Sequence, residues 1–240
     1  MTAEMEKEIA ENIARVWRKI QDHAEVAGRD PERIKLLVVT KEKSAIVVKT
    51  LVENGIHRIG ESYFKEASFK IDLLQDFDIE WHMIGYIQSG KAKQIAQVFD
   101  CVHSVDRREL AELLDQGAAE FGKKLPVFLE CNVSGEATKH GWSANEEDRW
   151  DELAEKLKPV LALEHLKIMG LMTIAPYAED PEKARPYFQR LARLLEYLQE
   201  KFPEQKLEEL SMGMSGDYTV ALEEGATYLR IGSAIVGKRD

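Results

Sequence analysis

The chain has 240 residues, enough for one large α/β domain or two small ones with a sizeable core. Its 43 acidic residues outnumber its 33 basic residues, and the net charge of −10 argues against a general nucleic-acid binder, which needs a basic face. The charged start MTAEMEKEIA lacks the apolar segment of a secretory signal, and no apolar run approaches the roughly 20 residues that cross a bilayer. Cys101 and Cys131 lie in apolar segments, where we interpret them as small hydrophobes in a reducing compartment. We therefore expect a cytoplasmic protein with no membrane or nucleic-acid partner.

The first segment is predicted to be a helix. Its apolar residues recur at helical spacing from Met5 to Ile20, with glutamates early and basic residues late, as the helix dipole favours. From Lys35 onward, short apolar strands alternate with amphipathic helical segments. The strands are expected near 35–40, 56–59, 80–84, 99–104, 126–132, 166–172, 207–211 and 227–231. The helices between them are expected at 44–54, 61–72, 90–97, 107–121, 146–158, 182–201 and 217–224.

Two of these helices carry signals at their starts. Ser143 and Glu146 form a capping-box pattern before the fifth of the seven helices between the strands. Asp180 and Pro181 open the sixth, while Pro186 predicts an irregular first turn there.

The element count favours a (β/α)8 TIM barrel with an extra N-terminal helix. Eight strands with seven helices between them leave the barrel one helix short after the last strand, and the N-terminal helix is expected to cover that gap. A doubly wound open sheet is the alternative, but it more often has fewer strands. No linker or repeat divides the chain, so we expect one domain over residues 1–240 and a monomer.

Lys41 is the first candidate functional residue. It directly follows the buried strand LLVV, where the strands of a barrel end and its chemistry is usually found. A lysine that is drawn into an apolar site becomes easier to deprotonate and can act as a nucleophile. The alternative is a side chain that turns to solvent or pairs with Glu42.

The seventh and eighth loops predict a phosphate site. The segment SMGMSGDYTVALEEG, from Ser211, places Ser215 in a glycine-rich turn before a helix, and Gly232 and Ser233 follow the eighth strand. Barrel enzymes commonly bind phosphate after strands seven and eight. Since the last strand of a barrel pairs with the first, Arg230 is expected to lie beside Lys41. An amine near a phosphate cradle suits pyridoxal 5′-phosphate.

The sequence resembles the pyridoxal phosphate homeostasis proteins, a family of alanine-racemase-like single-barrel proteins. Nearly the whole chain takes part in the resemblance. Its carriers, in order, are LLVVTKEKS, HRIGESYFKEA, EWHMIGYIQSGKAK, VHSVDR, MGLMTIAP, LSMGMSGDY and YLRIGSAIVG.

The resemblance implies a role for each site residue. Lys41 is expected to form a Schiff base with the cofactor, Arg230 to face its pyridine nitrogen, and Ser215 to hold its phosphate together with the backbone amides of Gly232 and Ser233. Met212, Ser62 and His82 are expected to line the pocket. Lys139 resembles a second family lysine that is linked to cofactor handover. Two positions depart from the family pattern, which usually has Asn at Ser62 and often has Asn at Gly90.

Three functions remain open from the sequence. Because a guanidinium stays charged, Arg230 disfavours protonation of the ring nitrogen and so weakens the ring as an electron sink. The first hypothesis is a protein that binds pyridoxal phosphate and delivers it to apo-enzymes, with little or no turnover. The second is a single-domain amino-acid racemase with Lys41 as one base and Tyr63 or His82 as the other. The third is a Schiff-base aldolase that acts on a sugar phosphate. His82 and His103 lack metal-ligand spacing and are expected to pack in the core or in the pocket.

Overall fold

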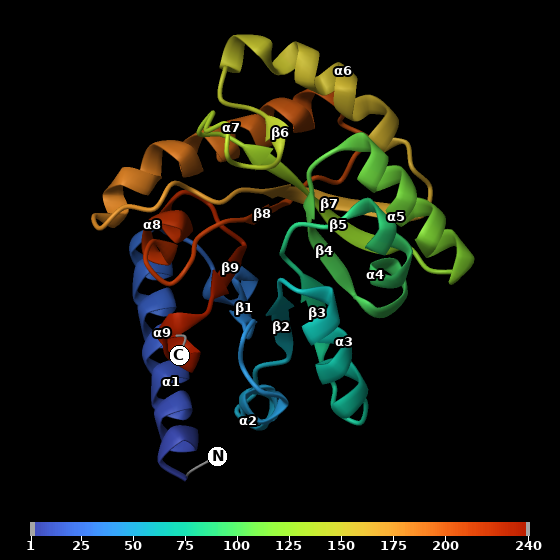
Figure 1. The fold of residues 1–240 in the computed structure, drawn as a ribbon. Coiled ribbons are helices and arrows are strands. Elements are labelled where there is room, and N and C mark those ends of the chain that lie inside the picture. Colours follow the sequence, from blue (N-terminus) through green and yellow to red (C-terminus); the bar gives the residue numbers. More distant parts are fainter. Residues whose placement is uncertain (1–2, 239–240) are drawn as a thin grey trace.

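The computed structural model describes residues 3–238, and eight parallel strands in it form a closed barrel (Figure 1). Each strand pairs with its neighbours in the order β1-β2-β3-β4-β5-β7-β8-β9, and β9 returns to β1. The barrel strands are β1 (Lys35–Val39), β2 (Arg58–Glu61), β3 (Glu80–Met83), β4 (Cys101–Val105), β5 (Leu125–Asn132), β7 (Leu166–Met172), β8 (Glu209–Ser211) and β9 (Tyr228–Ile231). The predicted (β/α)8 barrel is confirmed.

Helices lie between the strands and surround the barrel (Figure 1). They are α2 (Ala45–Glu53), α3 (Phe64–Leu73), α4 (Ala92–Val98), α5 (Arg108–Glu120), α6 (Trp150–Leu161), α7 (Arg185–Lys201) and α8 (Tyr218–Glu223), and the short α9 (Ser233–Val236) follows the last strand. Short 3-10 turns precede three of them, at η2 (Ser89–Lys91), η3 (Glu147–Arg149) and η4 (Pro181–Ala184), and a fourth, η1 (Pro31–Arg33), precedes β1. The η4 turn is the irregular first turn that Pro186 predicted for the helix expected at 182–201, which corresponds to α7.

The N-terminal helix α1 (Ala3–Val26) covers the barrel where a full outer helix is missing. It packs on α8 and on the single turn of α9, which the sequence did not predict, and Figure 1 shows the three side by side. Asn12 donates a hydrogen bond of 2.9 Å to the Ile235 carbonyl, and the apolar face from Ile9 to Ala24 is buried. The extra helix therefore completes the outer layer, as expected.

The predicted capping box before α6 is wrong. Ser143 lies in a two-residue strand, β6 (Trp142–Ser143), that pairs with the end of β5, and the chain then passes through η3 before α6 begins at Trp150. The Ala144 amide donates to the Asn132 carbonyl at 3.0 Å, so pairing with β5 holds this segment extended. Strand pairing prevails over the local helix-start signal.

The buried apolar residues form two clusters. The larger lies between the strands and the helices, and the smaller contains Cys101, Phe128, Met172 and Tyr228 from four strands inside the barrel. Both cysteines are free and buried. None of the helices in residues 3–238 has the length and apolar character needed to span a membrane.

Candidate functional site

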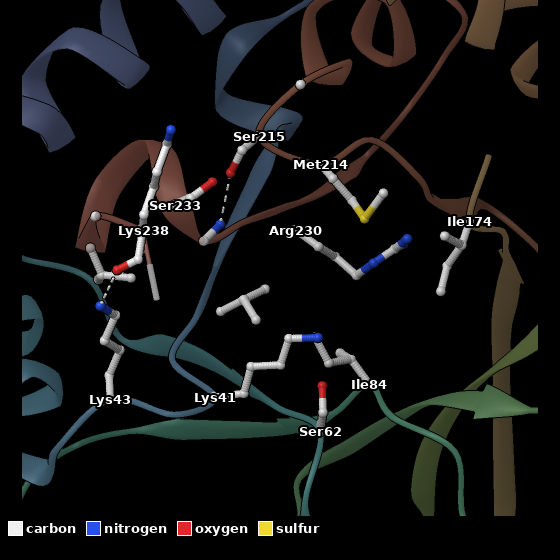
Figure 2. A pocket seen from close by; sticks show the side chains of 15 residues that line it. Lys41, Lys43, Ser62, Ile84, Ile174, Met214, Ser215, Arg230, Ser233 and Lys238 are labelled. Carbon is white, nitrogen blue, oxygen red and sulfur yellow. Dashed lines mark hydrogen bonds between the residues drawn. The ribbon is translucent and has the colours of Figure 1, made fainter. Parts of the chain in front are cut away.

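A cavity of about 460 Å³ lies at the carboxyl ends of the strands, and six of the predicted site residues line it together (Figure 2). Lys41 comes from the end of β1, Arg230 from β9, and Ser215 from the loop before α8. In Figure 2 the Lys41 and Arg230 side chains both point into this space. The lining residues are Val39, Lys41, Lys43, Ser62, Ile84, Ile174, Met214, Ser215, Gly216, Arg230, Gly232, Ser233, Val236, Gly237 and Lys238.

All the charged side chains that line this cavity are basic. Four of the lining residues carry basic side chains: Lys41, Lys43, Arg230 and Lys238. None of the fifteen lining residues, all within the described part of the chain, is acidic. Since the protein as a whole has a net charge of −10, this local basic excess marks a site for an anionic ligand.

A buried ion-pair network holds the turn that carries Lys41. The Lys70 amine, only 3% exposed, donates to the Thr40 carbonyl at 2.7 Å and to Glu61 Oε1 at 2.7 Å. The Thr40 hydroxyl donates to the same Glu61 oxygen at 2.5 Å. Burial raises the pKa of Glu61, and the charge and hydrogen bond of Lys70 oppose that shift. Lys70 and Glu61 thus fix the backbone immediately before Lys41.

The same network extends to the residue after Lys41. Glu66 accepts a hydrogen bond of 2.6 Å from Lys70 and one of 2.7 Å from the backbone amide of Glu42. Glu42 has a φ of 64°, a left-handed conformation that is uncommon for a residue other than glycine. Sequence reasoning missed this network. Two features of the sequence could have indicated the network: Glu61 is an acidic residue at the end of a strand, and Lys70 lies on the buried side of the following helix, α3.

The phosphate loop is built around Ser215. Its hydroxyl oxygen accepts hydrogen bonds of 3.2 Å from the backbone amides of Gly232 and Ala234. The turn before it is held by the Asp217 carboxylate, which accepts from the Met214 amide at 2.6 Å. Gly213 has a φ of 91°, and a Cβ there would lie 2.6 Å from the Cβ of Ala221, so the loop requires glycine. The expectation that Ser215 and the amides of Gly232 and Ser233 hold a phosphate stays a prediction, and all three residues line the cavity.

Arg230 is almost fully buried and has two fixed partners. Nη1 donates to the Ser211 hydroxyl at 2.7 Å, and Nη2 donates to the Thr173 carbonyl at 2.8 Å. Burial lowers the pKa of Arg230 to about 10, which leaves the guanidinium charged at neutral pH. The cavity therefore has a cation in its wall with a defined orientation.

Met212 and His82 do not line this cavity, contrary to the prediction. Both side chains are 0% exposed. Ser211 points into the barrel toward Arg230, so its neighbour Met212 points the other way and packs in the outer core. His82 lies inside the barrel, where it contacts His103. The methionine that reaches the cavity is Met214.

A second cavity of about 840 Å³ adjoins the first and shares Lys41, Ser62, Ile84 and Ile174 with it. It also contains Tyr63 and Glu130, together with Tyr86 and His140, whose rings stack with centroids 4.2 Å apart. Burial raises the pKa of Glu130 to about 7, and the nearby charge of Asp106 adds to that shift.

The remaining predicted positions lie around these cavities. Lys139 lines a smaller hollow with Glu130 and donates to the Ile174 carbonyl at 3.0 Å and to Glu136 at 2.6 Å. Gly90 lies in open space, since a Cβ there would meet no atom within 4 Å.

The chain matches known proteins over most of its length. Residues 10–240 match the family model described as alanine racemase, N-terminal domain. The chain is 41% identical over 232 residues to the pyridoxal phosphate homeostasis protein of Pseudomonas aeruginosa, covering 97% of this chain and 96% of that protein. It is 39% identical over 229 residues to the protein of the same name from Aquifex aeolicus, covering 95% and 97%.

Solved structures show the same relationship. PipY of Synechococcus elongatus, determined with PLP bound, superposes with a TM-score of 0.81 at 32% identity, covering 95% of this chain and 100% of that one. The alanine racemase of Streptomyces coelicolor superposes with a TM-score of 0.72 at 15% identity, covering 96% of this chain and 58% of that one, and shares the fold.

Proposed function

The chain belongs to the pyridoxal phosphate homeostasis protein family, and from that premise we propose that it binds pyridoxal 5′-phosphate through a Schiff base on Lys41 and serves as a carrier of this cofactor, with little or no turnover. PLP-dependent apo-enzymes are the recipients in this proposal. The observation that carries it is the position of Lys41, Arg230 and Ser215 on one cavity whose lining is basic and contains no acid among the described residues.

The residues present fit the cofactor. Pyridoxal phosphate, when bound, supplies an aldehyde and an electron-withdrawing ring. The phosphate is a dianion, which the basic lining and the turn at Ser215 favour. A Cβ at Gly216, which also lines the cavity, would meet no atom within 4 Å, so the turn leaves open space beside Ser215.

Each residue has a role of its own in this proposal. Lys41 forms the covalent bond through its amine, on a turn that the Lys70 network holds in place. Arg230 donates to the pyridine nitrogen from a side chain already oriented by Ser211 and Thr173. Because a guanidinium keeps its protons at neutral pH, it leaves the ring nitrogen unprotonated and limits carbanion chemistry.

The composition of the lining supports low turnover. A racemase needs an acid/base group on each face of the substrate carbon. Apart from its basic residues, the described lining of the first cavity contains no titratable side chain, and Tyr63, a candidate second base, lines the adjoining cavity with its side chain about half exposed. His82, the other candidate, is buried inside the barrel.

The covalent bond is tested by the absorbance of purified protein after incubation with pyridoxal phosphate. Wild type should become yellow and should retain the cofactor on Lys41 after borohydride reduction, as peptide mass spectrometry would show. Lys41→Ala should stay colourless. Lys43→Ala removes a second lysine from the same cavity and is the matched control, which should remain yellow. A cofactor adduct mapped to Lys43 or Lys238 would refute the assignment.

Turnover and delivery are tested separately. The α-proton of alanine should not exchange in deuterated water at a rate above that of free cofactor, whereas rapid exchange that is lost in Lys41→Ala would favour the racemase. The delivery test uses a PLP-dependent apo-enzyme and a scavenger of free pyridoxal phosphate. The loaded protein should restore the activity of the apo-enzyme faster than an equal concentration of free cofactor does.

A further inference from the structure

A continuous line of polar side chains runs through the interior of the barrel and ends at Arg230. Arg230 Nη1 donates to Ser211 Oγ at 2.7 Å, and Ser211 Oγ lies 2.8 Å from His103 Nδ1. His103 Nε2 lies 2.9 Å from His82 Nδ1, and His82 Nε2 lies 3.0 Å from Glu80 Oε1. We name Glu80, His82, His103 and Ser211 the axial chain. Its members come from β3, β4 and β8, and Arg230 comes from β9.

The axial chain joins the two ends of the barrel. Glu80 is the first residue of β3, so it lies at the end opposite the cavity, where its other carboxylate oxygen pairs with Arg58 at 2.9 Å. The three residues between Glu80 and Arg230 are 0% exposed. A charge at the far end is thus connected to the cavity wall entirely through buried groups.

The contacts allow one arrangement of protons. Arg230 can only donate, so Ser211 Oγ accepts from it, and the buried hydroxyl proton has His103 Nδ1 as its available acceptor among the described residues. His103 is then neutral and carries its proton on Nε2, which donates to His82 Nδ1. His82 in turn carries its proton on Nε2, facing Glu80.

The three hydrogen bonds from Arg230 to His82 therefore point in the same direction, toward Glu80. Aligned bonds of this kind polarise one another in a medium of low dielectric constant. The contact between His82 and Glu80 is short but not aligned as a hydrogen bond.

The surroundings keep both imidazoles in place. The His103 ring stacks on Phe128 with centroids 4.3 Å apart and meets the edge of Tyr228 at 5.5 Å. The titratable or charged groups around the axial chain are Arg58, Cys101, Tyr228 and Arg230, with Lys35 above the Tyr228 ring and paired with Glu209. Burial, with the charge of Arg230, holds the pKa of His103 well below its usual range. The neutral state required by the contacts is thus also the state that burial favours.

We propose that Glu80, His82, His103 and Ser211 are positioning residues that act through Arg230, fixing its guanidinium as the donor that meets the ligand in the cavity. This inference rests on the proposed function for its ligand, but the proton arrangement belongs to the protein alone. Each terminal nitrogen of Arg230 has one fixed partner, Nη1 with Ser211 and Nη2 with Thr173, so losing Ser211 frees one end of the guanidinium. Glu80 acts at a distance, through the polarity of the buried bonds.

A metal site is the competing interpretation of the same residues. Ligand atoms of His82, Cys101 and His103 lie within 4.8 Å of one another. Burial raises the pKa of the Cys101 thiol well above its usual range, which disfavours the thiolate that a zinc ion needs. His82 and His103 already use one ring nitrogen each to contact the other. The hydrogen-bonded chain therefore accounts for the contacts better than an ion does.

The first experiment uses the protein without cofactor. Nuclear magnetic resonance of nitrogen-15-labelled histidine rings should show two neutral imidazoles at neutral pH, both protonated on Nε2. His103→Asn and His82→Asn assign the two signals. A proton on Nδ1 of either ring, or an imidazolium at neutral pH, would overturn the arrangement. So would stoichiometric zinc binding that shifts both signals.

The second experiment measures the effect on the ligand. Ser211→Ala should weaken pyridoxal phosphate binding about tenfold, whereas Ser211→Thr, which keeps the hydroxyl, should recover most of that loss. The absorbance of the bound cofactor should also titrate at a different pH in Ser211→Ala, which a purely structural role would not cause.

Glu80→Gln tests the remote end against a matched control. It should shift the same absorbance titration and weaken binding about threefold, through loss of charge at the end of the axial chain. Glu209→Gln removes a carboxylate from the same end of the barrel, outside the axial chain, and should leave both quantities unchanged. Equal effects of the two variants would refute the proposal. If wild type binds no pyridoxal phosphate, the proposed function fails, while the histidine spectra still decide the proton arrangement.

Discussion

Leu37 in β1 pairs with Arg230 in β9, so the last strand of the barrel lies directly beside the strand that ends before Lys41. The Gly213 carbonyl accepts the Arg230 amide at 3.0 Å, which ties the loop of Ser215 to the same strand. Barrel closure thus brings the Lys41 amine to a guanidinium and a phosphate loop that lie more than 170 positions later in the sequence.

The buried pair behind Lys41 should be essential for stability. Lys70→Met leaves the Glu61 carboxylate buried without its partner, and we expect a loss of about 3–5 kcal/mol in the free energy of unfolding. Urea denaturation measures this loss. Lys49→Met breaks the exposed pair with Glu53 and should have little effect. A small loss for Lys70→Met would mean that water reaches Glu61.

Glu130 should make stability depend on pH. Its folded pKa of about 7 lies above the unfolded value, so the folded state holds the proton more tightly. Stability should fall as pH rises from about 4.5 to about 7, by up to roughly 3 kcal/mol, and then level off. Glu130→Gln should remove this part of the dependence, being more stable than wild type at about pH 8 and similar at about pH 5. Denaturation curves of both proteins at the two pH values test the sign, and parallel curves would contradict it.

Gly85 should be required for the position of Ser62. A Cβ at Gly85 would lie 2.3 Å from the Ser62 carbonyl oxygen, so Gly85→Ala must displace the loop that lines both cavities. We expect pyridoxal phosphate affinity to fall at least about tenfold, measured by absorbance titration of folded protein. Gly90→Ala adds the same methyl group where nothing lies within 4 Å and should bind normally. Normal binding by Gly85→Ala would show that Ser62 is dispensable.

Ser215 should act on the phosphate group alone. Ser215→Ala removes the hydroxyl that the Gly232 and Ala234 amides contact, and affinity for pyridoxal phosphate should fall about tenfold. Affinity for pyridoxal, which lacks the phosphate, should not change. Ser68→Ala, in the adjoining cavity, is the control. An equal loss of affinity for both ligands would mean that Ser215 does not act through the phosphate.

The sequence predicted the barrel well because its signals are local and repeated. Each strand is a short apolar run and each helix a periodic one, so eight such units, with Lys41 at the first strand end and Ser215 in the seventh loop, define the closed fold. The capping box at Ser143 failed because pairing with β5, a contact distant in sequence, overrode a local preference.

What only the tertiary structure decided is the identity of the buried polar partners. The sequence alone does not reveal that Lys70 reaches Thr40 and Glu61, or that His82 faces His103 inside the barrel and leaves the cavity to Met214. A side chain's periodicity tells which face it is on, but hydrogen-bond partners depend on strand register and barrel closure, which bring distant residues within about 3 Å. The sequence by itself determined the fold and the residues at the strand ends, while closure determined which of them meet.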